Sequence, residues 1–109
     1  MASPTSRSLQ ELKKRGFTAQ VVERFNSFSK KRIDLFGCID IVAIKQGTGI
    51  VGIQATTTSH IQERIDKALK EPKIKEWLAC GGLFWVWGWS KKGAKGKRKL
   101  WMVEERRFV

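Results

Sequence analysis

The feature that most constrains the fold of this chain is a pair of apolar, β-type runs separated by a glycine-containing turn. The first run covers residues 39–44, the second covers residues 49–55, and a Gln-Gly-Thr-Gly segment joins them. Runs of this kind, separated by a few residues that include glycine, are typical of a β-hairpin. The centre of the chain is therefore expected to form an antiparallel strand pair.

Each run carries one polar side chain near an end. Asp40 stands at the start of the first run and Gln54 near the end of the second. In an antiparallel pair joined at the far ends the two side chains would lie close together, and the two-residue period puts Thr56 on the same face as Gln54. A buried carboxylate without a partner is costly. Three explanations fit the polar cluster: a capped turn, a buried hydrogen-bond network, or a metal site.

Length and composition predict a single globular domain over residues 1–109. The chain is 41% hydrophobic and 29% charged, which is typical of a soluble globular protein rather than a disordered one. It contains no apolar run long enough to cross a bilayer, and its first residues lack the core of a signal peptide. We expect a cytoplasmic, intracellular protein without membrane association. Cys38 and Cys80 lack the paired spacing of a zinc site, and both are expected to be small core residues.

The charge balance is strongly basic. A formal net charge of +12 results from 22 Lys and Arg residues against 10 Asp and Glu residues. Such a field attracts polyanions, and nucleic acid is the commonest one inside cells. No amphipathic basic helix of the kind that lies on membranes is present, and the basic residues cluster in expected loops. Nucleic acid is therefore favoured over a membrane surface or an acidic protein.

The segments before the hairpin predict a helix, a strand and a loop. Residues 7–16 form the expected helix, with Thr5 or Ser6 as its cap and Gly16 at its end. Residues 17–23 have the alternating, β-branched character of a strand. Residues 24–31 are polar and are expected to form a loop, with two phenylalanines tucked beneath it as a local cluster, namely Phe25 and Phe28.

The segments after the hairpin predict two helices and a second strand pair. The expected helices cover residues 57–71, capped by Thr58 or Ser59, and residues 73–80, which follow Pro72. Residues 83–89 are apolar on both faces, as in a strand buried within a sheet. Their tryptophans, which could stack on bases, are expected in the core or at a dimer interface instead. A Gly/Lys loop over residues 90–99 leads to a strand at 100–103, and the whole predicts an α/β or α+β layer with a mixed sheet.

The motifs of the central hairpin resemble those of the PD-(D/E)xK nuclease superfamily. Gly37-Cys-Ile-Asp-Ile-Val-Ala-Ile44 is similar to its G-x-x-D-I-V-A-I pattern, and Gly52-Ile-Gln-Ala-Thr56, followed by a helix, is similar to its G-I-Q-A-T pattern. The resemblance is greatest to the archaeal Holliday-junction-resolvase and VRR-NUC-like branch, which includes small phage-encoded proteins. It covers the chain from about residue 8 to residue 89 and implies a restriction-endonuclease-like core: a central mixed β-sheet flanked by helices.

The resemblance also implies a metal site. Asp40 is then the first carboxylate, Gln54 stands where a second acid is usual, and Ala55 offers a backbone carbonyl between them. Mg²⁺ (or Mn²⁺) prefers such hard oxygen ligands and can activate a water molecule for attack on phosphorus. Resolvases of this kind pair their subunits, so a homodimer is expected as well.

Two positions depart from the superfamily pattern. Gln54 is neutral and holds a cation less strongly than a carboxylate does. Thr56 occupies the position of the motif lysine, and a hydroxyl cannot neutralise a transition state as an ammonium group can. A neighbouring cation could supply the missing charge, and Arg64, on the following helix, is favoured over Lys67 and over Lys45, which falls on the opposite pleat from Asp40.

Two further acids stand near the expected site. Glu23 ends the first predicted strand, and Asp34 lies in the loop that enters the motif strand. Each could complete the metal site, or could instead form a surface ion pair with Arg24, Lys31 or Arg32.

Several segments are candidates for contact with nucleic acid. The hydroxyl-rich run at 57–59 lies beside an expected helix start, where phosphate oxygens bind readily, and a flexible basic loop can follow a phosphate backbone. The predicted contact residues are Lys30, Lys31, Arg32, Thr57, Thr58, Ser59, Lys91, Lys92, Lys95, Lys97, Arg98 and Lys99.

The sequence thus predicts a metal-dependent DNA endonuclease, acting on branched or otherwise structured DNA, with catalytic candidates Asp40, Gln54, Thr56, Glu23 and Arg64. One alternative is a nucleic-acid-binding protein that keeps the fold and has lost cleavage, as Thr56 in place of lysine suggests. Another is a small basic structural protein of a ribonucleoprotein or phage particle, which would have no reason to place Asp40 beside Gln54.

Overall fold

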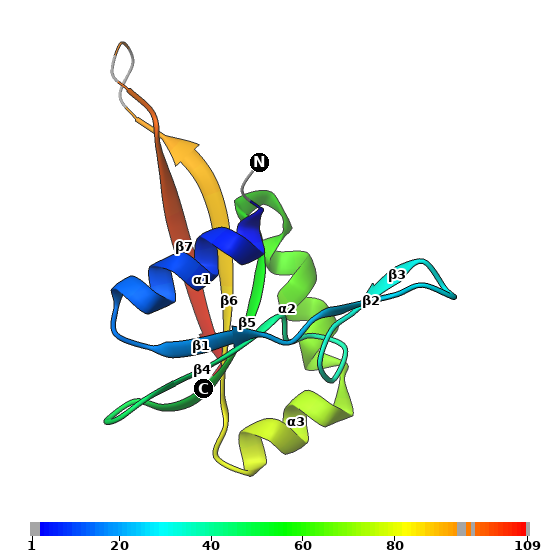
Figure 1. Cartoon of the computed structure of the whole chain (residues 1–109). Coiled ribbons are helices and arrows are strands. Elements are labelled where there is room, and N and C mark those ends of the chain that lie inside the picture. The colour runs from blue at the N-terminus through cyan, green and yellow to red at the C-terminus, as the bar shows by residue number, and fades with distance from the viewer. Residues whose placement is uncertain (1–2, 94–95, 97, 109) are drawn as a thin grey trace.

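The protein is an α/β structure built on a five-stranded mixed sheet with three α-helices (Figure 1). The computed structural model describes residues 3–93, 96 and 98–108. The strand order in the sheet is β1-β4-β5-β6-β7, and β2 and β3 form a separate two-stranded sheet. The α-helices are α1 (Pro4–Lys14), α2 (Ile61–Leu69) and α3 (Pro72–Ala79). The strands are β1 (Thr18–Val21), β2 (Arg24–Asn26), β3 (Lys31–Ile33), β4 (Ile41–Lys45), β5 (Gly49–Thr57), β6 (Leu83–Lys92) and β7 (Leu100–Phe108).

Helix α1 begins earlier than its sequence predicts. Ser3 is the cap: its hydroxyl accepts the Ser6 N–H at 3.1 Å, while the Ser6 hydroxyl accepts the Ser3 N–H at 2.9 Å. This reciprocal pair occupies two backbone donors at the helix start, so the prediction of Thr5 or Ser6 as the cap is wrong. The helix ends just before Gly16, whose φ of 90° confirms its expected role as terminator.

The central hairpin is confirmed. β4 and β5 pair antiparallel, from Ile41 opposite Ile53 to Lys45 opposite Gly49. Within β5, a Cβ atom at Gly52 would lie 2.6 Å from Cδ1 of Ile39, so the packed side chain of Ile39 leaves room only for glycine.

Strand β6 lies inside the sheet and is buried on both faces, as predicted. It runs parallel to β5 and antiparallel to β7. Trp85, Trp87 and Trp89 pack with Leu12 of α1 on one face, whereas Phe84 and Val86 pack on the other with residues of α2 and α3. The tryptophans are therefore core residues. Trp89 also donates its indole N–H to the Ser8 hydroxyl at 2.8 Å, a contact that ties α1 to β6.

The segment after β5 is not one helix from residue 57. A 3-10 turn, η1 (Thr58–His60), precedes α2, and neither η1 nor α2 has a side-chain cap, so the prediction of Thr58 or Ser59 as the cap is wrong. The reason is packing: a Cβ atom on Gly88 of β6 would lie 2.9 Å from the Thr58 Cα, so this turn lies directly against the sheet. The predicted helix at residues 73–80 is present as α3, which begins one residue earlier, at Pro72, and has Glu71 as its cap.

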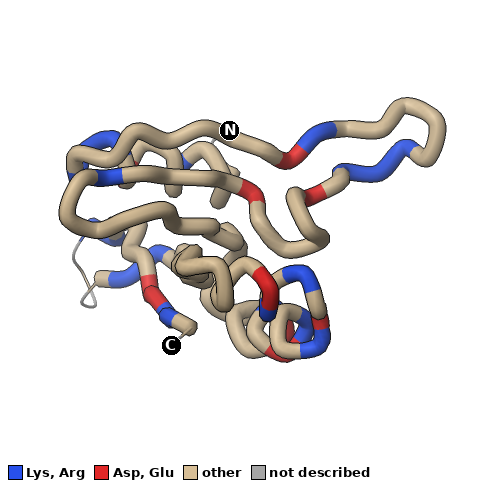
Figure 2. The backbone as a smooth tube through the Cα atoms, turned by 90° about the horizontal axis from the view of Figure 1, so that it is seen from below, with Lys and Arg blue, Asp and Glu red and all other residues tan. Residues whose placement is uncertain are grey.

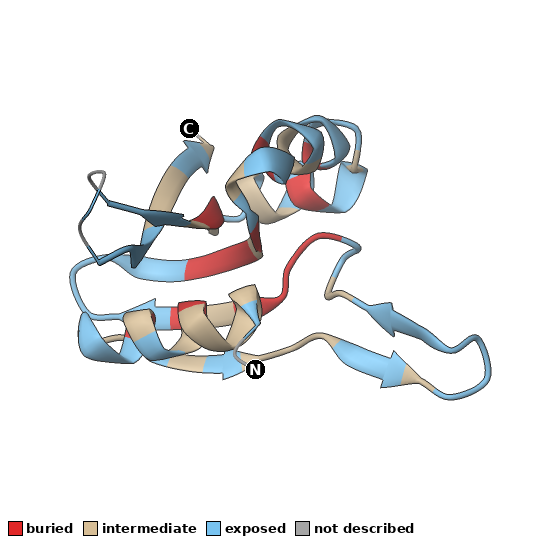
Figure 3. Ribbon diagram, turned by 90° about the horizontal axis from the view of Figure 1, so that it is seen from above, coloured by how far each residue is buried: buried red, intermediate tan, exposed pale blue. Residues whose placement is uncertain are grey.

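Residues 24–33 form a projecting hairpin, here called the β2–β3 arm, rather than the predicted loop. Arg24 pairs with Ile33 at its base and Asn26 with Lys31 near its tip. The expected cluster of Phe25 and Phe28 is wrong, because the two side chains are 64% and 99% exposed. The arm projects from the five-stranded sheet (Figure 3), so the core of the sheet gives these rings no cover.

The two cysteines differ in their burial. Cys38 is buried as expected, but Cys80 is exposed, because it caps the C-terminus of α3 at the surface. β7 continues to Phe108, since its pairing with β6 extends well past residue 103. The longest helix in the described part of the chain has 11 residues, and none reaches the length and apolarity that a membrane crossing requires.

Candidate metal centre and adjoining basic groove

The backbone of Asp40 joins three strands at the point where their regular pairing ends. Its N–H donates to the carbonyl of Ile53 at 2.9 Å, and its carbonyl accepts the N–H groups of Val22 at 2.8 Å and of Glu23 at 3.3 Å. Two consecutive residues opposite one carbonyl are the arrangement of a β-bulge, which redirects side chains at a strand end. The bulge brings Glu23 beside Asp40.

The Asp40 side chain lies in a buried hydrogen-bond network with β5. The residue is 3% exposed, and its Oδ2 accepts the backbone N–H of Ala55 at 2.8 Å and the Nε2 of Gln54 at 3.1 Å. Pairing of β4 with β5 ends at Ile41 and Ile53, so the Ala55 N–H is left for the carboxylate. The predicted closeness of Asp40 and Gln54 is confirmed. The role of the Ala55 carbonyl as a metal ligand stays a prediction.

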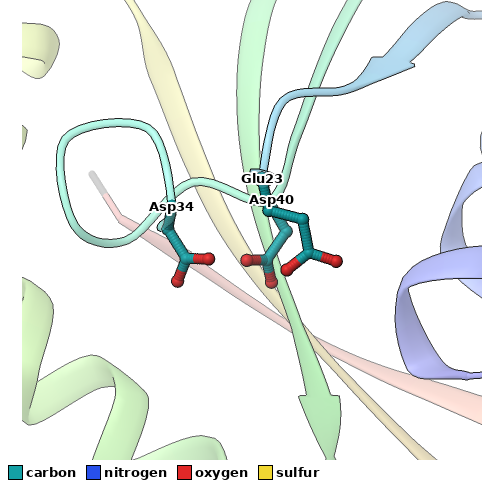
Figure 4. A group of neighbouring side chains, drawn as sticks. All are labelled: Glu23, Asp34 and Asp40. Carbon is teal, nitrogen blue, oxygen red and sulfur yellow. The ribbon is translucent and has the colours of Figure 1, made fainter. Parts of the chain in front are cut away.

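Three carboxylates converge at this position. Glu23 follows β1, Asp34 follows β3 and Asp40 precedes β4, and one oxygen of each lies within 4.8 Å of the others. Figure 4 shows the three side chains gathered in one place from separate segments of backbone. We call this group the acidic cluster. Both acids that the sequence left open, Glu23 and Asp34, belong to it.

The acidic cluster changes the protonation of Asp40. Burial raises the pKa of Asp40 to about 8, and the hydrogen bond and negative charge of Asp34 add to the rise. The hydrogen bond from the Ala55 N–H opposes it, and the charge of Glu23 reinforces it. Without a cation, the surroundings of Asp40 therefore favour its protonated form, because a desolvated carboxylate beside other acids is disfavoured in its ionised form.

The alternative role proposed for Glu23, a surface ion pair, is also present. Its Oε1 lies 3.3 Å from Nη1 of Arg32. The Arg32 side chain is 69% exposed, so this pair contributes little to stability. For Asp34, no ion pair with Arg24, Lys31 or Arg32 occurs within 4.0 Å among the described residues.

The residues present fit a divalent cation. The Oε1 of Gln54 is buried and has no hydrogen-bond partner within the described part of the chain. A half-turn of the amide exchanges Oε1 with Nε2 and turns the oxygen toward Asp40. Carboxylate and amide oxygens are the ligands that Mg²⁺ and Mn²⁺ take, and a cation here would replace the Asp40 proton and satisfy the orphaned Gln54 oxygen. The candidate ligands are Asp40, Glu23, Asp34 and Gln54.

The cations considered as substitutes for the motif lysine lie in different surroundings. Lys45 donates to the Arg15 carbonyl at 2.8 Å at the far end of β4, in agreement with its low ranking from sequence. Lys67 lines the same groove as Asp34. Arg64, one helical turn before it, is half-buried, and its Nε has no partner among the described residues. Thr56 is 5% exposed on β5.

A basic groove adjoins the acidic cluster. It lies between the β2–β3 arm and helices α2 and α3 and has a volume of about 650 Å³. Asp34 is the acid in its lining, beside five cationic side chains: Arg24, Lys31, Arg32, Lys67 and Lys73. The sequence pointed to only two of these, Lys31 and Arg32, as nucleic-acid contacts. The others were missed because their segments meet only in three dimensions; the density of Lys and Arg in residues 24–32 was the available signal.

The remaining predicted contact residues lie elsewhere. Thr57 ends β5, and Thr58 and Ser59 lie in the turn η1 before α2; the Thr57 and Ser59 hydroxyls lie 3.2 Å apart. Lys91 and Lys92 are exposed at the end of β6, paired with Trp101 and Leu100, and Arg98 and Lys99 are exposed before β7. Lys95 and Lys97 lie outside the described residues.

Comparisons of the chain with protein-family models, with curated proteins and with solved structures found no match.

Proposed function

We propose that this protein is a metal-dependent DNA endonuclease with a restriction-endonuclease-like core. One observation carries the proposal: three carboxylates, from Glu23, Asp34 and Asp40, converge within 4.8 Å at the edge of a groove lined by five cations. Carboxylates packed this closely are suited to a divalent cation, and the surrounding positive charge is suited to a phosphodiester backbone.

The order of elements supports the fold assignment. Helix α1 leads to β1, the antiparallel β4–β5 hairpin carries Asp40 and Gln54, and α2 connects β5 to a parallel strand, β6. This is the order that the hairpin motifs imply for a PD-(D/E)xK nuclease.

The residues of the site have separable tasks in this proposal. A bound Mg²⁺ or Mn²⁺ would polarise the phosphate and lower the pKa of a water molecule, which is the chemistry that hydrolysis of a phosphodiester needs. Asp40 would lose its proton to solvent when the cation binds, and would then supply a carboxylate held in place by the Ala55 N–H. Gln54 and the two other acids would complete the oxygen set. Lys67, or Arg64 one turn away, stabilises the negative charge that grows on the phosphate.

A cleavage assay with isosteric variants tests the proposal. Supercoiled, single-stranded and four-way-junction DNA are incubated with the wild type in Mg²⁺, in Mn²⁺ and in a chelator. Asp40→Asn keeps the shape of the side chain and removes the charge, whereas Asp66→Asn makes the same change at an exposed acid on α2, outside the cluster. Cutting by the wild type and Asp66→Asn that requires metal and is lost in Asp40→Asn supports an endonuclease.

The same assay separates the alternatives. The runner-up is a DNA-binding protein that retains the fold without cleavage, favoured by a buried Thr56 at the position of the motif lysine. It predicts a retained gel shift with intact DNA in every metal. Absence of any shift at low salt would contradict both and leave the basic structural protein.

We further propose that the protein acts as a homodimer. One described surface suited to a second copy is the start of the edge strand β7, where Leu100, Trp101 and Met102 are each at least 41% exposed. Light scattering of the wild type and of Met102→Glu tests this: a dimer that becomes monomeric in the variant supports it, and a monomeric wild type contradicts it.

A further inference from the structure

The tip of the β2–β3 arm presents a phenylalanine that has no role in packing. Phe28 is 99% exposed. Its backbone is nonetheless ordered by Asn26, whose Oδ1 accepts the N–H groups of Phe28 at 2.9 Å and of Ser29 at 3.2 Å. Lys30 closes the turn in the left-handed conformation, with φ of 54°. Because the turn is already ordered, its exposed apolar ring can contact a partner with little further loss of conformational entropy.

The charge around this ring indicates the chemistry of the partner. Lys and Arg occur at the base of one strand of the arm and along the returning strand, while the acids lie only near its base (Figure 2). The cations of the arm are Arg24, Lys30, Lys31 and Arg32. An apolar protein surface would leave these charges desolvated, whereas nucleic acid offers phosphates for the cations and flat base faces for the phenyl ring.

The basic groove links the arm to the acidic cluster. Arg24, Lys31 and Arg32 line the groove from the arm, and Lys67 and Lys73 line it from the helices. Asp34 lies in the same groove and belongs to the acidic cluster. A DNA strand whose base contacts the tip can therefore run its phosphates through the groove toward the carboxylates.

We propose that Phe28 stacks on an unpaired base of DNA whose backbone occupies the basic groove, so that the substrates of this protein are duplexes interrupted by unpaired bases. The inference rests on the proposed function for its choice of DNA and narrows the substrate class of that same site. Bases of an intact duplex are already stacked, and opening them costs a few kcal/mol. An unpaired base can stack on the ring without this cost. The protein should therefore bind DNA with an unpaired base more tightly than a fully paired duplex.

Binding without metal provides the test, because it does not depend on cleavage. Fluorescence anisotropy in a chelator compares a duplex carrying one bulged nucleotide with the same duplex fully paired. The wild type is expected to bind the bulged duplex about 5- to 150-fold more tightly, the ratio that corresponds to about 1–3 kcal/mol for stacking of one base on an aromatic ring. With 2-aminopurine as the bulged base, stacking on Phe28 also changes its fluorescence.

Variants of Phe28 leave the core intact, because the ring is exposed, and they test whether the ring stacks on the base. Phe28→Ala and Phe28→Leu are expected to bind both duplexes equally, whereas Phe28→Trp keeps the preference because it keeps a flat ring. Leu69→Ala removes a side chain that is 69% exposed on α2, away from the arm, and is expected to behave as the wild type.

Three outcomes would overturn the inference: equal binding of the two duplexes by the wild type, an unchanged preference in Phe28→Ala, or an unchanged preference in Phe28→Leu. Failure of the proposed function is distinguishable from these. Intact DNA in every metal, together with a preference that Phe28→Ala abolishes, would contradict the endonuclease and support the role of the arm.

Discussion

The backbone N–H of Ala55 donates a 2.8 Å hydrogen bond to Oδ2 of Asp40, a residue 15 positions earlier in the chain. The bond forms where β4 and β5 stop pairing, so a carboxylate takes the place of the next backbone acceptor. It fixes the orientation of a carboxylate that burial disfavours in its charged form. Asp40 is therefore oriented by a backbone donor, and its charged form is disfavoured unless a cation offsets the negative charge.

Asp40 should make the metal-free protein less stable as the pH rises. Its pKa is about 8 in the folded protein and near 3.8 when unfolded, so its stabilising contribution is complete below the unfolded value and is lost as the pH rises through the folded one. Relative to Asp40→Asn, the wild type should lose up to about 1.4 kcal/mol of unfolding free energy per pH unit within this window. Urea denaturation between pH 5 and 9 in a chelator measures the difference.

The Asp66→Asn variant of the cleavage assay is also the control for this pH dependence. Asp66→Asn removes an exposed carboxyl group and should follow the wild type at every pH. Added Mn²⁺ should restore the wild type at pH 8 and leave Asp40→Asn unchanged. If the free energy of unfolding depended on pH in the same way in the wild type and in Asp40→Asn, the surroundings of Asp40 would not raise its pKa.

Gln54→Glu should increase the affinity for Mn²⁺ about tenfold or more, because a carboxylate binds a hard cation more strongly than an amide oxygen does. Without metal the same change should lower the melting temperature, since it puts a further negative charge within 3.1 Å of Oδ2 of Asp40. Calorimetric titration measures the affinity, and thermal denaturation with and without Mn²⁺ measures the stability.

Gln20→Glu is the matched control, because it makes the same substitution at an exposed position on β1. It should change neither quantity appreciably. Equal Mn²⁺ affinity in Gln54→Glu and the wild type would argue that Gln54 does not face the cation.

Lys67→Ala should slow DNA cleavage about 100-fold at saturating protein, the size of effect expected when one group that stabilises the transition state is removed. Lys67 lines the groove together with Asp34. Arg64→Ala should have the smaller effect of the two, and Lys70→Ala, which changes an exposed lysine outside the groove lining, should have none. Single-turnover rates measure all three. A larger loss in Arg64→Ala would instead support the choice made from sequence.

Gly52→Ala should destabilise the protein by about 1–3 kcal/mol, the usual range for overpacking of a protein core. The added Cβ would lie 2.6 Å from Cδ1 of Ile39. In an Ile39→Val background, which lacks that atom, the same substitution should cost less, and a double-mutant cycle of unfolding free energies measures the coupling. Additive changes in the free energy of unfolding would mean that the added Cβ and the Ile39 side chain do not clash.

The central hairpin and the closeness of Asp40 and Gln54 could be predicted because both follow from local rules. A turn between two apolar runs sets the register, and the two-residue period then decides which side chains share a face. The buried β6 was predictable for a similar reason, since a run that is apolar on both faces has to be covered on both.

The β2–β3 arm could not be predicted in this way. Its strands have three residues each and face solvent, so no apolar alternation marks them. The convergence of Glu23, Asp34 and Asp40 depends on a bulge and on the path of the chain around the arm, and neither has a sequence period. The turn before α2 was missed because tertiary contact with Gly88, rather than local capping, decides where that helix begins.

The bond between the Ser8 hydroxyl and the Trp89 indole has a consequence for biosynthesis. The two residues are 81 positions apart, so α1 emerges from the ribosome long before its partner strand exists. The β4–β5 hairpin can close on its own, but the tryptophan face that covers α1 arrives only when β6 has been translated. Until then the part of α1 that packs on these tryptophans stays open to water, and nascent chains that stall before β6 should be the ones that chaperones bind.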